Sequence, residues 1–99
     1  MTRIAAYVPD LMDRSKVAAA AKGVRFVASA DELASVDADL VVLDLSRPGA
    51  VDVIPRLTAR TLGFGRHTQR ELLDAARRAG CDEVLVRSDF FPRLSELLR

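Results

Sequence analysis

The sequence has few of the features that mark secreted and membrane proteins. It contains a single cysteine, Cys81, so no disulfide can form within the chain and a reducing compartment is the natural expectation. Its apolar runs fall far short of the roughly 20 residues that a membrane-spanning helix needs. The first residues lead directly into a strand-like pattern, without the layout of a signal peptide. We therefore expect a cytoplasmic protein that does not associate with membranes.

An excess of charge of one sign is also missing. Fifteen basic residues against fourteen acidic ones leave a formal net charge of +1, and no block of like charge exceeds two residues. A surface for nucleic acid or for an anionic membrane would need a clear excess of positive charge, so we expect neither partner. With 49% hydrophobic and 29% charged residues, the 99-residue chain has the balance of a globular protein. Its length suits one domain, covering residues 1–99.

One apolar run in the middle of the chain indicates where a functional edge lies. Residues 40–45 (LVVLDL) place four apolar residues before the carboxylate of Asp44, and the turn residues SRPG follow. A short run of this kind, β-branched at its centre and closed by turn residues, is typical of a strand buried on both faces. Open α/β sheets bind their ligands at the carboxyl ends of such strands. We therefore expect Asp44 at the functional edge of a parallel sheet.

Similar apolar segments alternate with helical patterns along the whole chain. The expected strands are residues 4–8, 24–28, 40–45, 61–64 and 83–86. The expected helices are residues 11–22, a short one after 29, a short or broken one after 49, one at 68–79 and a final one after 88. This alternation suits right-handed crossovers between parallel strands. The predicted fold class is α/β, a three-layer sandwich of five parallel strands with about five helices.

Capping signals indicate where several of these helices begin. Asp10 can cap the first helix, with Asp13 three residues further on. Ser29 with Glu32 has the spacing of a capping box, and the clearest such box in the chain runs from Thr68 to Glu71. The residues of the first helix that we expect to face the sheet are Leu11, Ala18 and Ala21.

The segment LVVLDLSRPG, residues 40–49, resembles the phosphoacceptor strand of bacterial response-regulator receiver domains. Those domains have the same apolar run into Asp and the same Pro-Gly shortly afterwards, and the five-fold β/α alternation resembles their layout over the whole chain. The resemblance implies a flavodoxin-like (CheY-like) sheet of strand order 2-1-3-4-5. It also implies a signalling domain of a two-component system rather than an enzyme, with Asp44 at the phosphoacceptor position.

The other landmarks of the receiver family are altered in this chain. Receivers usually have paired acids after the first strand, where this chain has Pro9-Asp10. Gly65 takes the place of the hydroxyl residue that usually follows the fourth strand, and Arg87-Ser88 replaces the Lys-Pro pair after the fifth. The sequence therefore resembles a divergent, stand-alone pseudo-receiver.

The resemblance also suggests how the residues near Asp44 could act. Phosphoryl transfer to a carboxylate needs a divalent cation and a positive group for the developing charge. Asp10 and Asp44 could supply two ligands to Mg²⁺, and Asp13 a third through a water molecule. Arg87 and the backbone at Gly65 are the candidates for phosphate contact. In the alternative interpretation, Asp10 only caps a helix and Arg87 forms an ion pair with Asp44.

Three functions are compatible with these residues. The altered landmarks favour a signalling or protein-interaction module that is independent of phosphorylation, with an unknown protein partner. The first alternative is a divergent phosphoacceptor that is modified on Asp44 with Mg²⁺. The second alternative is a binder of a small molecule or phosphate ligand at the carboxyl ends of the strands.

The final helix carries two adjacent phenylalanines that bear on self-association. Its expected cap is Ser88 or Asp89, and successive helical residues point about 100° apart. Phe91 belongs to the apolar stripe, so we expect Phe90 near the surface. The corresponding prediction is a homodimer through the C-terminal helix region that the substitution Phe90→Glu weakens.

Overall fold

The computed structural model describes residues 2–98 and places five parallel strands in one sheet of order β2-β1-β3-β4-β5. Strand β3 lies at the centre, paired in parallel with β1 on one side and with β4 on the other. The predicted α/β class and its flavodoxin-like strand order are therefore confirmed. The strands are β1 (Ile4–Tyr7), β2 (Arg25–Phe26), β3 (Leu40–Asp44), β4 (Arg60–Gly65) and β5 (Glu83–Val86).

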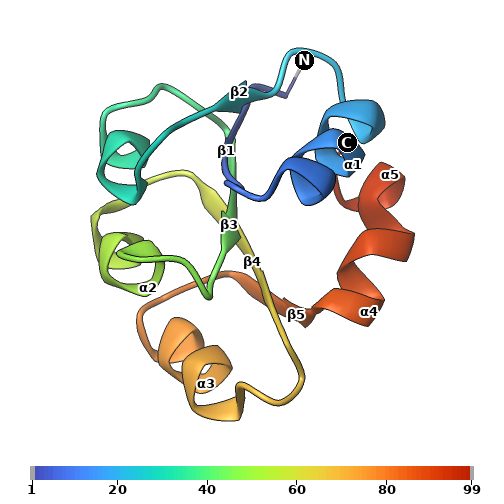
Figure 1. Ribbon diagram of the computed structural model, residues 1–99. Helices are drawn as coiled ribbons and strands as arrows, with labels where there is room; N and C mark the ends of the chain where they lie inside the picture. Colours follow the sequence, from blue (N-terminus) through green and yellow to red (C-terminus); the bar gives the residue numbers. More distant parts are fainter. Residues whose placement is uncertain (1, 99) are drawn as a thin grey trace.

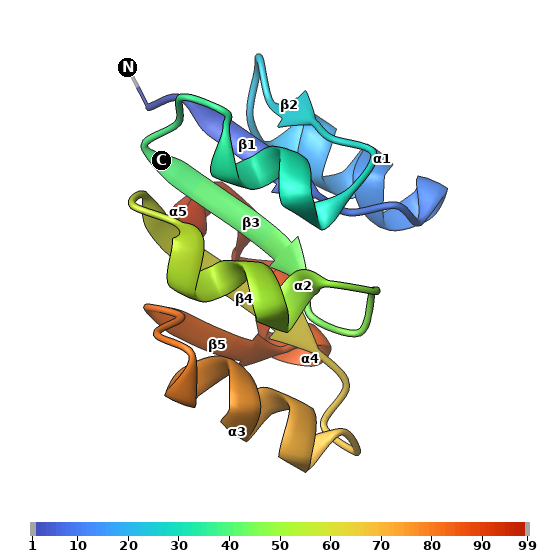
Figure 2. The same cartoon turned by 90° about the vertical axis from the view of Figure 1, so that its left-hand side faces the viewer.

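Helical segments cover both faces of this sheet, as Figures 1 and 2 show. One face carries α1 (Leu11–Ala20) and a C-terminal segment made of α4 (Arg87–Phe90), the 3₁₀ turn η3 (Phe91–Arg93) and α5 (Leu94–Leu97). The other face carries η1 (Ala30–Ala34), α2 (Ala50–Val53) continued by η2 (Ile54–Arg56), and α3 (Arg70–Arg78). This is the predicted three-layer sandwich. Within residues 2–98, no helix combines the length and the apolar character that crossing a membrane requires.

The core consists of two apolar layers, one on each face of the sheet. Strands β1 and β3 are buried along their whole length, because helices cover both of their faces. Successive side chains of a strand point to opposite faces, so Val41 and Leu43 enter one layer while Val42 enters the other. In the second layer Phe90 stacks on Phe64 with ring centroids 4.4 Å apart, which ties the C-terminal segment to the sheet.

Helix α1 buries a different face from the predicted one. Leu11 is 74% exposed and Ala18 is exposed as well, so the prediction that they face the sheet is wrong, whereas Ala21, just after the helix, packs against the core as predicted. The buried residues are Asp13 and Val17, which lie four residues apart and therefore on one side of the helix. The apolar pattern predicted the wrong face of the helix because Asp13, a carboxylate of the kind that usually stays in water, occupies one of the two buried positions.

The capping signals are only partly confirmed. Ser29 and Glu32 form the predicted capping box at the start of η1. The predicted box from Thr68 to Glu71 does not form, because Thr68 still lies in a turn and the chain enters α3 after Gln69 without a side-chain cap.

The two adjacent phenylalanines take the opposite places from the predicted ones. Phe90 is fully buried, and Phe91 is only half-buried. The reason is that Phe90 stacks on Phe64 of β4, in a helical segment that begins at Arg87, earlier than the expected caps. The buried stripe then starts at Phe90 and continues with Leu94 and Leu97. Phe90→Glu would therefore disrupt the core, and the homodimer stays a prediction that this substitution cannot test.

Truncating the buried ring at position 90 tests this arrangement. Phe90→Ala should lower the free energy of unfolding by about 3–5 kcal/mol, because it removes a stacked aromatic side chain from a packed core. Leu11→Ala, on an exposed side chain, should change it by no more than about 0.5 kcal/mol. Urea denaturation followed by circular dichroism measures both, and equal effects of the two substitutions would contradict the packing described.

The thiol of Cys81 should be unreactive in the folded protein. Burial raises its pKa to about 11, and its Sγ donates to the carbonyl oxygen of Glu83 at 3.2 Å. A raised pKa keeps the thiol neutral at physiological pH, whereas the thiolate is the reactive form. Labelling with Ellman's reagent should be slow near neutral pH and fast after unfolding in urea. Fast labelling of the folded chain near neutral pH would contradict this placement.

Candidate functional site

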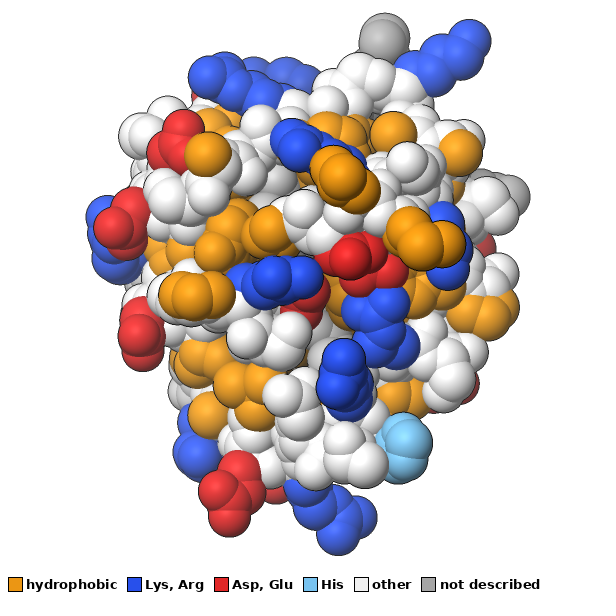
Figure 3. All heavy atoms as spheres, in the orientation of Figure 1, with side chains coloured by type: hydrophobic (Ala, Val, Ile, Leu, Met, Phe, Trp, Pro, Cys, Tyr) orange, Lys and Arg blue, Asp and Glu red, His pale blue; other side chains and the backbone are white. Residues whose placement is uncertain are grey.

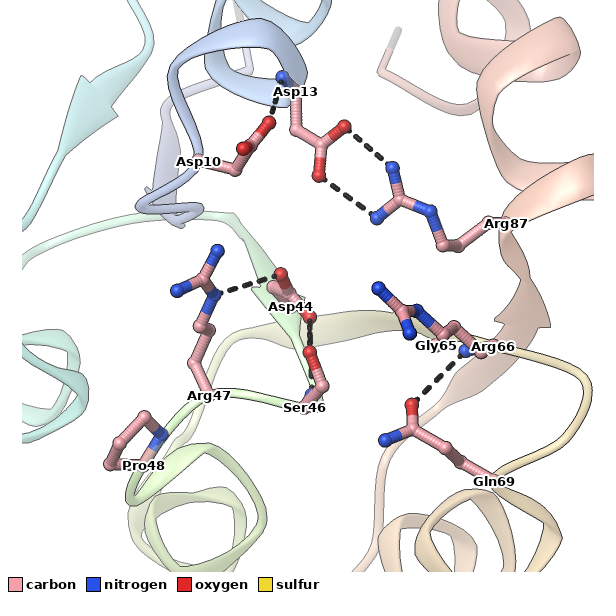
Figure 4. Close-up of a pocket in the computed structure, with 10 residues that line it drawn as sticks. All are labelled: Asp10, Asp13, Asp44, Ser46, Arg47, Pro48, Gly65, Arg66, Gln69 and Arg87. Carbon is pink, nitrogen blue, oxygen red and sulfur yellow. Dashed lines mark hydrogen bonds and ion pairs between the residues drawn. The ribbon is translucent and has the colours of Figure 1, made fainter.

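A pocket opens at the carboxyl ends of the central strands, where the loops after β1, β3, β4 and β5 meet (Figure 4). Its cavity has a volume of about 490 Å³. The five residues predicted for the site all line this pocket, and their roles remain predictions. They are Asp10, Asp13, Asp44, Gly65 and Arg87. The lining residues are Asp10, Asp13, Asp44, Ser46, Arg47, Pro48, Gly65, Arg66, Gln69 and Arg87.

Asp44 ends β3 inside this pocket and is only 3% exposed. Its Oδ1 accepts the backbone N–H of Ser46 at 3.1 Å and the hydroxyl of the same residue at 2.7 Å. Its Oδ2 accepts Nε of Arg47 at 3.4 Å. An aspartate side chain readily accepts a hydrogen bond from the backbone N–H of the residue two positions further on. The sequence Asp-Leu-Ser therefore forms a turn here. Both carboxylate oxygens are thus engaged by the loop that follows the strand.

That loop is held in place at its far end. The hydroxyl of Tyr7 in β1 donates to the backbone carbonyl of Pro48 at 3.2 Å. Gly49 then takes a left-handed backbone conformation with φ of 78°, which glycine adopts without strain, and α2 begins. These two constraints keep Ser46 and Arg47 close to Asp44.

Arg87 holds Asp13 in an ion pair with two hydrogen bonds. The distances are 2.9 Å from Nη1 to Oδ2 and 2.6 Å from Nη2 to Oδ1. The Asp13 side chain is 6% exposed and the Arg87 side chain 35%. Hydrogen bonding to Asp13 raises the pKa of Arg87 above its ordinary value. The guanidinium carbon also lies 4.8 Å from the ring centre of Phe91, so this side chain is both bonded and packed.

The ion pairs differ from the one considered from the sequence. Arg87 was a candidate partner of Asp44, but it pairs with Asp13, and the arginine beside Asp44 is Arg47. Asp10 is the cap of α1, as predicted, because its Oδ2 accepts the backbone N–H of Asp13 at 2.9 Å. The cap therefore also helps to place the carboxylate that Arg87 binds.

The three carboxylates that were candidate magnesium ligands each have a hydrogen-bond partner within the protein. Mg²⁺ requires oxygen ligands in nearly ideal octahedral geometry. Both oxygens of Asp13 bind Arg87, and both oxygens of Asp44 already accept hydrogen bonds. Within residues 2–98, no group of three His, Cys, Asp or Glu residues is placed to hold a metal ion. Arginine side chains on the same pocket supply the positive charge that the acids need.

Gly65 ends β4 at the pocket, where an added side chain would meet the end of the Leu73 side chain. A Cβ atom at this position would lie 2.9 Å from Cδ2 of Leu73 in α3. A hydroxyl residue, which the receiver pattern places here, would therefore require Leu73 to move. The Leu73 side chain of α3 therefore occupies space beside Gly65 that a hydroxyl residue would need.

Five lining residues were not predicted from the sequence, and these are Ser46, Arg47, Pro48, Arg66 and Gln69. Ser46 and Arg47 follow Asp44 by two and three residues, so an aspartate turn could have pointed to them. Arg66 and Gln69 carried no such signal. They reach the pocket through a turn after β4, in which the Arg66 N–H donates to Gln69 Oε1 at 3.4 Å.

Two solved structures share this architecture over almost the whole chain. A response regulator from Hahella chejuensis superimposes with a TM-score of 0.81 at 15% sequence identity, covering 98% of this chain and 92% of that one. A CheY-like response regulator from Mesorhizobium loti gives a TM-score of 0.72 at 17% identity, covering 98% and 95%. No protein-family model and no curated protein matches the sequence. The chain therefore has the fold of response-regulator receiver domains, as the segment LVVLDLSRPG indicated.

A double-mutant cycle tests the ion pair between Asp13 and Arg87. The substitutions Asp13→Asn and Arg87→Gln should show a coupling of about 1–3 kcal/mol in the free energy of unfolding, because one partner is buried and the geometry is two-pronged. The pair Asp74 and Arg77, with both side chains about half exposed, is the control and should couple by no more than about 0.5 kcal/mol. Similar couplings for the two pairs, measured by urea denaturation, would count against the arrangement.

Proposed function

We propose that this chain is a receiver-like signalling or protein-interaction module that works without phosphorylation and has no catalytic activity. Its receiver fold supports the general role. The observation that carries the finer proposal is the ion pair between Asp13 and Arg87, with hydrogen bonds at 2.9 Å and 2.6 Å. In this pair the charges of an aspartate and an arginine near Asp44 neutralise each other, so neither side chain requires a phosphoryl group or a metal ion as its partner.

The chemistry of the pocket favours this proposal over a phosphoacceptor. An attacking carboxylate needs a free oxygen and a cation that neutralises the incoming phosphoryl group. Here Oδ1 of Asp44 accepts two hydrogen bonds from Ser46, and Oδ2 faces Arg47. Arg87 is fixed on Asp13 and packed against Phe91, so moving it would break both contacts. Gly65 offers no hydroxyl that could follow a phosphoryl group.

A phosphorylation assay tests the proposal directly. The chain is incubated with acetyl phosphate and MgCl₂ and its intact mass is recorded, with a phosphorylatable receiver treated in parallel as a positive control. The mass of this chain should stay unchanged, because the carboxylate oxygens of Asp44 and Asp13 already have hydrogen-bond partners within the protein.

The Asp44→Asn variant is the matched control for that assay. A gain of one phosphate in the wild-type chain that is lost in Asp44→Asn would overturn the proposal. The same result would establish the divergent phosphoacceptor, which is the alternative function.

A further inference from the structure

The pocket presents positive charge to an incoming group, although its aspartates and arginines are equal in number. The carboxylates of Asp13 and Asp44 are buried, with side chains only 6% and 5% exposed. The Arg47 side chain is 40% exposed and Arg66 is exposed as well. Figure 3 views this edge of the sheet and shows Lys and Arg side chains on several sides of the acidic ones. Asp10 is half-buried at the same pocket, so a ligand meets the guanidinium groups of Arg47 and Arg66 together with one carboxylate, and the other two carboxylates lie behind them.

Arg47 and Arg66 still have hydrogen-bond donors to offer. Arg47 contributes only its Nε to Asp44, and the hydrogen bond that Arg66 donates to Gln69 comes from its backbone. The two side chains extend from different loops, after β3 and after β4, and line the same cavity. Figure 4 shows them on either side of Asp44. A guanidinium presents paired N–H donors whose spacing matches a carboxylate.

Two exposed apolar side chains follow directly after a residue that lines the pocket. Leu11 and Met12 are 74% and 72% exposed, and within residues 2–98 they are the large hydrophobic side chains that are exposed to solvent. They form the first turn of α1, directly after Asp10, which lines the pocket. Exposed apolar side chains next to a polar site are typical of a protein–protein contact.

We propose that this edge binds a protein partner through a short segment that carries a carboxylate side chain close to an apolar one. The carboxylate accepts hydrogen bonds from Arg47 and Arg66, and the apolar side chain covers Leu11 and Met12. This inference rests on the proposed function, because a pocket without phosphoryl group or metal leaves the two arginines open to a partner. The positive charge of Arg47 and Arg66 favours an acidic segment. The exposed side chains of Leu11 and Met12 favour a protein partner over a small free anion.

A selection of random linear peptides, displayed on phage against the immobilised chain, tests the proposal. The expected consensus places Asp or Glu within about four residues of a Leu, Ile, Met or Phe, the spacing that puts two side chains on one side of a helical segment. Selection on Arg47→Gln/Arg66→Gln should lose the acidic position, and selection on Leu11→Ser/Met12→Ser should lose the apolar one. Circular dichroism checks that both variants are folded.

A matched pair of arginines controls for net charge. Arg25 and Arg60 are exposed and begin β2 and β4, so they lie at the opposite edge of the parallel sheet. By fluorescence polarisation, Arg47→Gln/Arg66→Gln should weaken the selected peptide at least about tenfold, while Arg25→Gln/Arg60→Gln should leave its Kd unchanged.

The proposal would be overturned by the lack of an enriched consensus, by a consensus without an acidic residue, or by equal losses in the two arginine pairs. Succinate binding as tightly as the peptide would do the same, because the site would then take a free small anion. A failed selection with unmodified Asp44 removes this inference alone, whereas phosphate on Asp44 in the mass experiment removes the proposed function.

Discussion

The two-pronged ion pair between Asp13 and Arg87 is the contact on which the rest of the site depends. It joins the first turn of α1 to the residue that follows β5, two positions 74 residues apart in the chain. It buries an acid that would otherwise be costly to remove from water, and it keeps a guanidinium at the pocket. The charge of Asp13 is therefore balanced by an arginine of the same chain. A second ion pair, between Asp44 and Arg47, likewise places an arginine beside a buried carboxylate, here within one loop.

The fold could be predicted largely because its strands are buried on both faces. The run at residues 40–45 has no polar residue before Asp44, and the residues of β5 were predicted without error. The position of Asp44 at the pocket followed from the topology, since parallel strands end at one edge. The turn after it could have been recognised from the sequence, but the partners of Arg87 could not. That contact depends on how α1 and the C-terminal segment pack, which no local pattern records.

The errors have a common physical origin. Leu11 was placed against the sheet because it is apolar, but it is exposed, and the buried position in the first turn of α1 belongs to Asp13, which pairs with Arg87. Phe90 was placed outside because Phe91 was assigned to the apolar stripe, but Phe90 stacks on Phe64 in β4. In each case a long-range contact outweighed the local preference. The same packing leaves Leu11 and Met12 exposed in the first turn of α1, directly after Asp10, which lines the pocket.

A crystal structure grown with MgCl₂ and beryllium fluoride, a phosphoryl mimic, tests the central claim most directly. The expected structure keeps Arg87 on Asp13 with both hydrogen bonds and Arg47 beside Asp44, with neither magnesium nor beryllium fluoride in the pocket. A magnesium ion bound by Asp10 or Asp13, with beryllium fluoride on Asp44 and Arg87 turned away from Asp13, would contradict it.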